Sequence, residues 1–239
     1  MGAALVAQPA RDRSDAGQRH RGHRRRVCLI RGSSPCCGHS RIENVPRVAV
    51  LISGTGTLLQ SLIDDPRREY EIAVVGSDRP AAGLQRASDA GIPTLVARPG
   101  DYPDRTAWSA ALADLLADFT VDWVVSAGFM RILDATFLER FPQRVVNSHP
   151  ALLPAFPGAH AVADALAYGV KVTGCTVHLV DSGVDTGPII AQRTVAVEPG
   201  DDEDSLHERI KQVEWQLLPE VVNHLVAYGC TVNGRKVEL

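Results

Sequence analysis

Apolar residues occur along the chain in short runs that end at glycine-rich or polar turns. In "RVAVLIS", residues 47–53, β-branched and other apolar residues follow one another without alternation. Strands buried on both faces of a parallel sheet have this pattern. Runs of this kind predict five strands, at residues 47–53, 71–78, 93–97, 121–128 and 144–149.

Segments with helical features separate most of these runs. We expect helices over residues 54–64, 81–91 and 104–119, with Asp101 or Asp104 as the N-cap of the last one. Strands that alternate with helices are typical of a doubly wound sheet, in which helices cover both faces of parallel strands.

The pattern changes after residue 150. Residues 171–180 and 188–197 alternate or run apolar, and the polar loop "DSGVDTG" joins them, so we expect an antiparallel pair around a functional loop. Residues 201–229 form a long helical pattern with acidic residues at its start, which favours the helix dipole. The predicted fold class is therefore α/β, a Rossmann-like, doubly wound and mostly parallel sheet with antiparallel C-terminal strands.

Residues 1–46 differ from the rest of the chain. They lack periodicity and hold nine arginines and no lysine against three acidic residues, so we expect a disordered or non-native Arg-rich extension before a domain at 47–239. Two alternatives stay open for this segment, a basic arm for nucleic acid and a zinc site. The zinc site lacks the usual paired spacing; its candidate ligands are Cys28, Cys36, Cys37 and His39.

Charge and composition exclude several classes for the remaining residues. They hold 16 basic and 25 acidic side chains, so we expect no nucleic-acid partner. No apolar run approaches the ~20 residues that cross a bilayer, and the N-terminus lacks the order of a secretory signal. Five irregularly spaced cysteines do not suit a disulfide framework. These features predict a cytoplasmic protein without a membrane partner.

A glycine-rich turn, "SGTGTLL" at 53–59, lies where the first strand meets the first helix. Glycines let backbone N–H groups approach an anion, and a helix N-terminus adds partial positive charge. Position 59 is leucine and no lysine follows, so the turn is neither a dinucleotide fingerprint nor a P-loop. It is either a structural turn or a site for one small phosphate.

Asn147 and His149 are the candidate catalytic pair. They stand two residues apart at the end of the fifth strand, so their side chains point the same way, and ligands bind at this end of an α/β sheet. An amide beside an imidazole suits an oxyanion, and Asp185 in the polar loop would favour the imidazolium. Three prolines between 150 and 157 fix the following turn. No nucleophile elbow is present, so direct group transfer without a metal is expected.

Five segments carry a resemblance to a known family: "FMRIL", "NSHPALLPAFPG", "GCTVHLV", "DSGVDTGPI" and "DSLHERIKQVE". Over essentially all of 47–239 the chain resembles the phosphoribosylglycinamide formyltransferase family of purine biosynthesis. The resemblance implies a Rossmann-like formyltransferase fold and transfer of a formyl group from the co-substrate 10-formyltetrahydrofolate to the glycinamide amine. It implies small-molecule substrates as partners of a monomer or homodimer.

The resemblance also assigns roles to individual residues. His149 would be the catalytic acid, Asn147 would hold the formyl oxygen, and Asp185 would raise the basicity of His149. The phosphoribosylglycinamide site would contain Gly56, Thr57, Leu58, Lys211 and Glu214. The 10-formyltetrahydrofolate site would contain Arg105, Met130, Arg131, Ile132, Leu133 and Asn147.

Two further features follow from the comparison with the family pattern. A cis peptide bond is expected between Leu153 and Pro154. Leu58 stands where many relatives have asparagine, which would remove a side-chain donor from the phosphate loop while its backbone N–H groups remain.

Four alternative functions would need features that differ from those of formyl transfer to a glycinamide amine. A formyltetrahydrofolate deformylase would carry a longer, folded N-terminal regulatory domain, and a tRNA-directed formyltransferase would carry a basic C-terminal domain. A nicotinamide-dependent oxidoreductase could use Asp78 after the second strand but would need a fuller glycine fingerprint. A non-catalytic folate- or nucleotide-binding protein would not need Asn147, His149 and Asp185 together.

Overall fold

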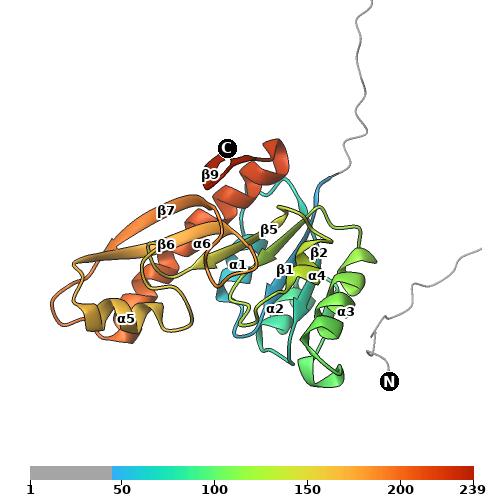
Figure 1. Ribbon diagram of the computed structural model, residues 1–239, viewed down its shortest axis with the longest axis horizontal. Helices are drawn as coiled ribbons and strands as arrows, with labels where there is room; N and C mark the ends of the chain where they lie inside the picture. Colours follow the sequence, from blue (N-terminus) through green and yellow to red (C-terminus); the bar gives the residue numbers. More distant parts are fainter. Residues whose placement is uncertain (1–44) are drawn as a thin grey trace, which may run out of the picture. The chain divides into compact units, whose positions relative to one another are not determined.

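Five parallel strands form the first half of a nine-stranded sheet in the computed structural model, which describes residues 45–239 (Figure 1). In spatial order they are β3 (Thr94–Val96), β2 (Glu71–Ser77), β1 (Arg47–Ile52), β4 (Trp123–Ser126) and β5 (Val145–His149). The predicted extension and its cysteine and histidine candidates lie outside the described residues, except for positions 45 and 46.

The second half of the sheet contains the antiparallel strands. β6 (Val172–Leu179) runs antiparallel to both β5 and β7 (Ile189–Ala196). β9 (Lys236–Glu238) pairs with β7 in parallel, and β8 (Thr231–Asn233) forms the edge. The predicted fold class, a mostly parallel sheet with antiparallel C-terminal strands, is confirmed.

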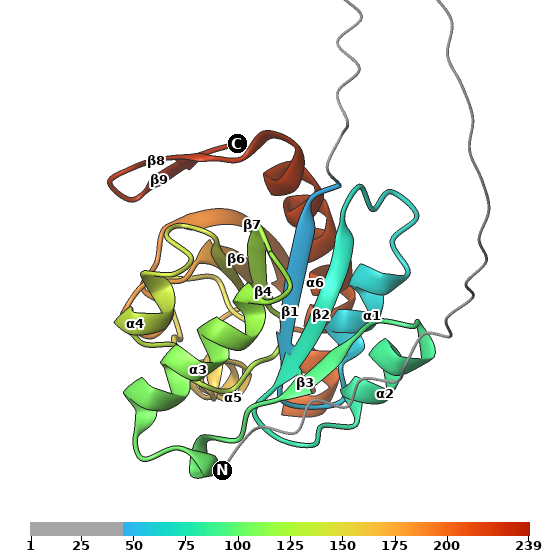
Figure 2. The ribbon, with the colours of Figure 1, turned by 90° about the vertical axis from the view of Figure 1, so that its right-hand side faces the viewer.

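Helices cover both faces of the sheet (Figure 2). One face packs against α1 (Thr57–Ile63), α2 (Gly83–Asp89), α5 (Ala161–Tyr168) and α6 (Glu203–Tyr228). The other packs against α3 (Arg105–Ala117) and α4 (Ala135–Leu138), and a short 3-10 helix, η1 (Pro99–Asp101), precedes α3. Asp104 is the N-cap of α3 and accepts from the Ala107 amide at 2.8 Å, so Asp104 and not Asp101 fills that role.

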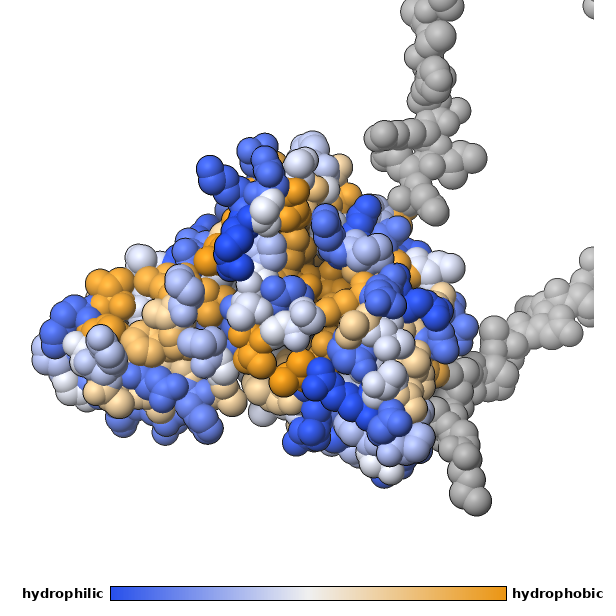
Figure 3. Space-filling model, in the orientation of Figure 1, coloured by the Kyte–Doolittle hydropathy of each residue, from blue (hydrophilic) through white to orange (hydrophobic). Residues whose placement is uncertain are grey.

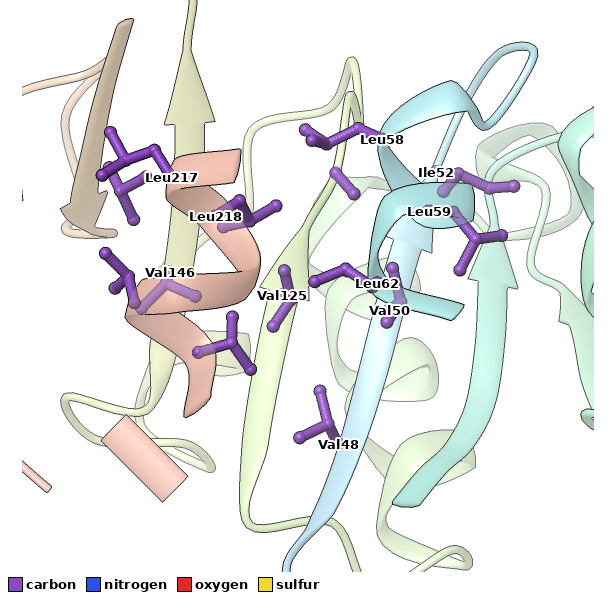
Figure 4. Close-up of a cluster of buried hydrophobic side chains, with 14 of the residues drawn as sticks. Val48, Val50, Ile52, Leu58, Leu59, Leu62, Val125, Val146, Leu217 and Leu218 are labelled. Atoms are coloured by element: carbon purple, nitrogen blue, oxygen red, sulfur yellow. The ribbon is translucent and has the colours of Figure 1, made fainter. Parts of the chain in front are cut away.

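The apolar runs divide between two cores because successive strand side chains point to opposite faces. Val50 and Ile52 of β1 join the core under α1 and α6, while Leu51 joins the core under α3. Figure 4 shows leucines of α1 beside β1 and leucines of α6 beside β4 and β5. Both faces of the parallel strands are thus buried, which explains their uninterrupted apolar sequences.

Several elements were not predicted from the sequence. α4 has four residues, β8 and β9 have three each, and α5 follows directly on a proline-rich turn. Short elements carry too few periods of a hydrophobic pattern to be recognised. Among the described residues, no helix is long and apolar enough to cross a membrane.

The sheet order reverses at β1, which pairs with β2 on one side and with β4 on the other. Ligands of open α/β sheets bind outside the carboxyl ends of the strands at such a switch point. The segments that leave this end are residues 53–57 after β1 and 127–134 after β4. In Figure 2 the parallel strands run downward from the start of β1, so this end lies at the bottom of the view.

Candidate active site

Asn147 and His149 lie at the carboxyl end of β5, beside the switch point. Cross-strand register sets Asn147 opposite His178 of β6, and the Asn147 Nδ2 atom lies 3.2 Å from His178 Nε2. His178 Nδ1 lies 2.8 Å from the Leu179 carbonyl oxygen. A carbonyl only accepts, so Nδ1 carries a proton, and Nε2 faces both the Asn147 amide and Asp185 Oδ1, which lies 3.5 Å away. His178 therefore orients Asn147.

His149 is buried and has an acceptor at each ring nitrogen. Its Nε2 lies 2.8 Å from the Phe156 carbonyl oxygen, and its Nδ1 lies 3.3 Å from Asp185 Oδ2. Only the imidazolium can donate to both. The three predicted catalytic residues, Asn147, His149 and Asp185, are thus brought together.

Burial and charge act on this pair in opposite directions. Burial lowers the pKa of His149 and outweighs the Asp185 carboxylate and the Phe156 carbonyl, which raise it. Asp185 therefore acts in the expected direction without setting the net shift. Burial raises the pKa of Asp185, but hydrogen bonds and the two neighbouring imidazoles lower it more, so Asp185 stays ionised.

The loop that carries Asp185 is fixed from several sides. Asp185 Oδ2 accepts from the Gly158 amide at 2.8 Å, and the Thr186 hydroxyl donates to Asp181 at 2.6 Å. A side chain at Gly187 would collide with the Leu179 carbonyl oxygen, 1.7 Å from an added Cβ, so only glycine fits. Arg235, in the β8–β9 turn, donates to the Thr186 carbonyl oxygen at 3.0 Å.

Thr176 of β6 holds the turn that follows His149. Its hydroxyl donates to the Ala151 carbonyl oxygen at 2.6 Å and accepts from the Leu153 amide at 3.0 Å. The Leu153–Pro154 peptide bond is cis, as expected. Phe156 in this turn has a φ of 54° and presents its carbonyl oxygen to His149.

The glycine turn is built by close packing as well as by helix geometry. Gly56 has a φ of 71°, and a Cβ there would come within 2.9 Å of Gly83 Cα. Arg86 of α2 donates from Nε to the Thr55 carbonyl oxygen at 2.9 Å, so a guanidinium lies against the turn. Amides in the first turn of α1 have no intrahelical acceptor and suit an anion.

Leu58 does not face the turn with its side chain. It is buried in the core with Leu59 and Leu62, as Figure 4 shows. At this position the leucine side chain therefore contributes to core packing, and it offers no donor to the phosphate loop, as expected. Only the Leu58 backbone N–H is positioned as a donor.

Lys211 and Glu214 lie on α6, on the other face of the sheet from Asn147 and His149. Glu214 is buried, and the Ser148 hydroxyl donates to its Oε1 at 2.6 Å. Ser148 points away from its two catalytic neighbours because strand side chains alternate. Burial raises the pKa of Glu214 to about 7, while the Ser148 hydrogen bond and the Lys211 charge lower it. Their helix, α6, packs against α1 on this face of the sheet.

The predicted folate segment follows β4 and has mixed exposure. Met130 is 66% exposed and Ile132 is 45% exposed, whereas Leu133 is buried under α3. Arg105 is exposed at the first turn of α3. In the space-filling view, apolar residues gather toward the middle of the face shown and polar residues surround them (Figure 3).

A cavity of about 530 Å³ lies at the opposite end of the sheet. Its lining includes Trp123, Arg144, Tyr228, Cys230 and Leu239, and it contains no predicted site residue. The polar groups that suit the chemistry converge at the carboxyl ends instead, so we do not assign the reaction to this cavity. Within residues 45–239, no group of three His, Cys, Asp or Glu side chains is arranged to hold a metal.

Several residues of the site are not predicted by the sequence pattern. His178 orients Asn147, Ser148 binds Glu214, and backbone groups of Phe156 and Gly158 contact His149 and Asp185. The alternation of "GCTVHLV" gave His178 a strand position, but only the pairing register brings it opposite Asn147.

Comparisons with known proteins agree with this geometry. The sequence model of the formyl transferase family matches residues 46–222. The phosphoribosylglycinamide formyltransferase of Mycobacterium tuberculosis (strain H37Rv) is 55% identical over 191 residues, which cover 79% of this chain and 89% of that protein. The Bacillus subtilis protein of the same name is 35% identical, with coverage of 80% and 98%.

A solved structure gives the same result. Glycinamide ribonucleotide transformylase 1 from Symbiobacterium toebii superimposes with a TM-score of 0.80 at 46% identity. The match covers 82% of this chain and 94% of that one.

Proposed function

The chain belongs to the formyl transferase family, and on this premise we propose that it transfers a formyl group from 10-formyltetrahydrofolate to the amine of N1-(5-phosphoribosyl)glycinamide. Relatives named for formyl transfer to this substrate match the chain over most of their own length. The observation that carries the proposal is the meeting of Asn147, His149 and Asp185 at the end of β5.

The reaction needs donors for an oxyanion. When the amine adds to the formyl carbon, negative charge develops on the formyl oxygen; the Asn147 amide is suited to donate to it, and protonated His149 supplies a positive charge beside it. Asp185 favours the imidazolium, while burial of the ring opposes it. The charged ring is therefore stabilised most when the oxyanion is present. A proton then passes from the amine to the departing folate nitrogen, through water near Asp185.

Two groups of residues support two substrate sites. The turn at Gly56, Thr57 and Leu58, with Arg86 beside it, suits the phosphate of the acceptor, and Lys211 and Glu214 lie on the same face. The exposed apolar side chains of Met130 and Ile132 suit a flat folate ring on the other face. Asn147 and His149 flank Ser148, the residue of β5 that contacts Glu214.

The test is a steady-state assay of folate product absorbance with both substrates present. We expect product only when the phosphoribosyl amine is supplied, and a much higher KM for the same amine without its phosphate. Formate release at an equal rate without the amine would support a hydrolase instead. Absence of product in both conditions would contradict formyl chemistry altogether.

A further inference from the structure

Asp78, directly after β2, is a fully buried carboxylate with two arginine partners. Its side chain is 0% exposed, whereas those of Arg79 and Arg131 are 50% and 44% exposed. Asp78 Oδ2 accepts from Arg79 Nη2 at 2.8 Å and from Arg131 Nε at 2.7 Å. Removing a charge from water costs desolvation free energy, so a buried carboxylate requires charged or hydrogen-bonding partners.

Ser53, at the end of β1, extends this pair to the backbone. Its hydroxyl oxygen accepts from the Met130 amide at 2.9 Å, and the hydroxyl is near enough to Asp78 to help lower the pKa of that carboxyl. Burial raises the pKa of Asp78, but the hydrogen bonds from Arg79, Arg131 and Ser53 lower it to about 2. Two consecutive residues are thereby held in place: Met130 by Ser53 through its amide, and Arg131 by Asp78 through its side chain.

The segment held in this way has no regular structure of its own. Residues 127–134 form neither helix nor strand. Phe129 and Leu133 anchor it in the core, while Met130 and Ile132 are left exposed. An irregular segment that exposes apolar side chains keeps its shape only through such fixed points.

A nucleotide-binding role for Asp78 does not fit these contacts. An acidic residue at this place in a dinucleotide-binding sheet binds ribose hydroxyls, which requires an accessible carboxylate. Asp78 has no exposed side-chain surface, and its carboxylate already interacts with Arg79, Arg131 and Ser53.

We propose that Asp78 is a positioning residue for the formyl donor, which holds Met130–Leu133 in the shape that receives the folate ring without touching it. The inference rests on the proposed function for the location of the donor. It adds a residue outside the segments that carry the family resemblance, and it assigns Ser53 the role of holding the Met130 amide beside Asp78.

Asp78→Asn, which removes the charge and keeps the shape, is the first test. We expect the KM for 10-formyltetrahydrofolate to rise about tenfold or more while the KM for the phosphoribosyl amine stays within about twofold. Asp65→Asn is the matched control. The Asp65 side chain is 3% exposed and is bonded to Arg67 and Asn223. Asp65 lies after the C-terminal end of α1, whereas the glycine turn lies at the N-terminal end. A folded Asp78→Asn with an unchanged donor KM, or with both KM values raised equally, would overturn the proposal.

A second measurement does not depend on turnover. Hydrogen–deuterium exchange of the Met130 amide, followed by NMR in the ligand-free protein, should accelerate in Asp78→Asn and Ser53→Ala but not in Asp65→Asn. Ser53→Ala also covers the case in which Asp78→Asn does not fold, because it leaves both arginine pairs intact. Equal exchange in all four proteins would overturn the proposal.

The two hypotheses can fail separately. If the unaltered protein transfers no formyl group, the proposed function fails, and binding of an unreactive 10-formyl folate analogue then tests Asp78. Weaker analogue binding in Asp78→Asn than in Asp65→Asn would support the positioning role, and equal binding would overturn it. If transfer occurs and Asp78→Asn leaves donor KM and Met130 exchange unchanged, only this inference fails.

Discussion

The two faces of the sheet differ in structure at the carboxyl end of the parallel strands, although each is predicted to hold one substrate there. The acceptor side, residues 54–58 with Ser148 and Glu214, consists of backbone groups and one buried carboxyl over a continuous apolar core. The donor side, residues 130–133, exposes apolar side chains and depends on the buried carboxylate of Asp78 and its partner Arg131. A small charged group needs fixed N–H donors, whereas a flat ring needs an exposed apolar surface.

Among variants that leave His149 in place, the largest expected effect is at Asp185, its carboxylate partner. Asp185→Asn should lower kcat by on the order of 10²-fold or more while both KM values change little, because the carboxylate stabilises charge that develops during the reaction. The measurement is the pH–rate profile with both substrates. A variant whose profile overlays that of the unaltered protein would show that the carboxylate does not act through His149.

The acceptor side alone should respond to Thr57→Asp. Thr57 is the first residue of α1, where a negative charge favours the helix but repels a phosphate. We expect the KM for the phosphoribosyl amine to rise by about 10- to 100-fold with no loss of thermal stability. Thr57→Asn is the uncharged control. An unchanged KM in Thr57→Asp would remove the phosphate from this turn.

Gly56 is a poorer target for the same question. Its positive φ and its contact with Gly83 mean that any larger side chain disturbs folding as well as binding. A raised KM in such a variant would not separate the two causes.

Glu214 should give the acceptor side a distinct pH dependence of stability. Its pKa is about 7 in the folded protein against 4.5 ordinarily, so the folded state binds the proton more tightly. Its contribution is fully present below pH 4.5 and is lost as pH rises through about 7. In thermal unfolding across this range, Glu214→Gln should gain stability relative to the unaltered protein as pH rises. A constant difference between the two proteins would contradict the assignment.

The smallest expected effect is at Arg235, which supports the Asp185 loop from the C-terminal hairpin. Arg235→Ala should lower kcat by about two- to fivefold, because an exposed arginine contributes modestly to the order of a loop. Lys236→Ala, one residue further along, is the matched control. Equal rates for both variants would assign the hairpin no part in holding Asp185.

Much of this architecture could be predicted from local sequence pattern. Strands such as 47–53 carry their own signal because both of their faces are buried, and Asp104 precedes a clear helix. The spacing of Asn147 and His149 likewise fixes their common direction. What could not be predicted is the pairing of distant residues: Ser148 and Glu214 are 66 residues apart, and Asp78 and Arg131 are 53 apart.

Leu58 illustrates the same limit at a single residue. Its place in the glycine turn indicated a change in the phosphate loop, yet the start of α1 directs its side chain into the core. Whether a residue at a helix start faces a ligand or the core depends on where the helix packs. That is a tertiary property, and the local sequence does not contain it.

Both substrates are proposed to meet at His149, and neither is expected to depend on His149 for binding. The most direct test is the single-turnover rate of His149→Gln together with calorimetric dissociation constants for each substrate. We expect the rate to fall by about 10³-fold or more and both constants to stay within about threefold of the unaltered protein. A rate within about tenfold of the unaltered protein, or loss of binding of either substrate, would contradict the account.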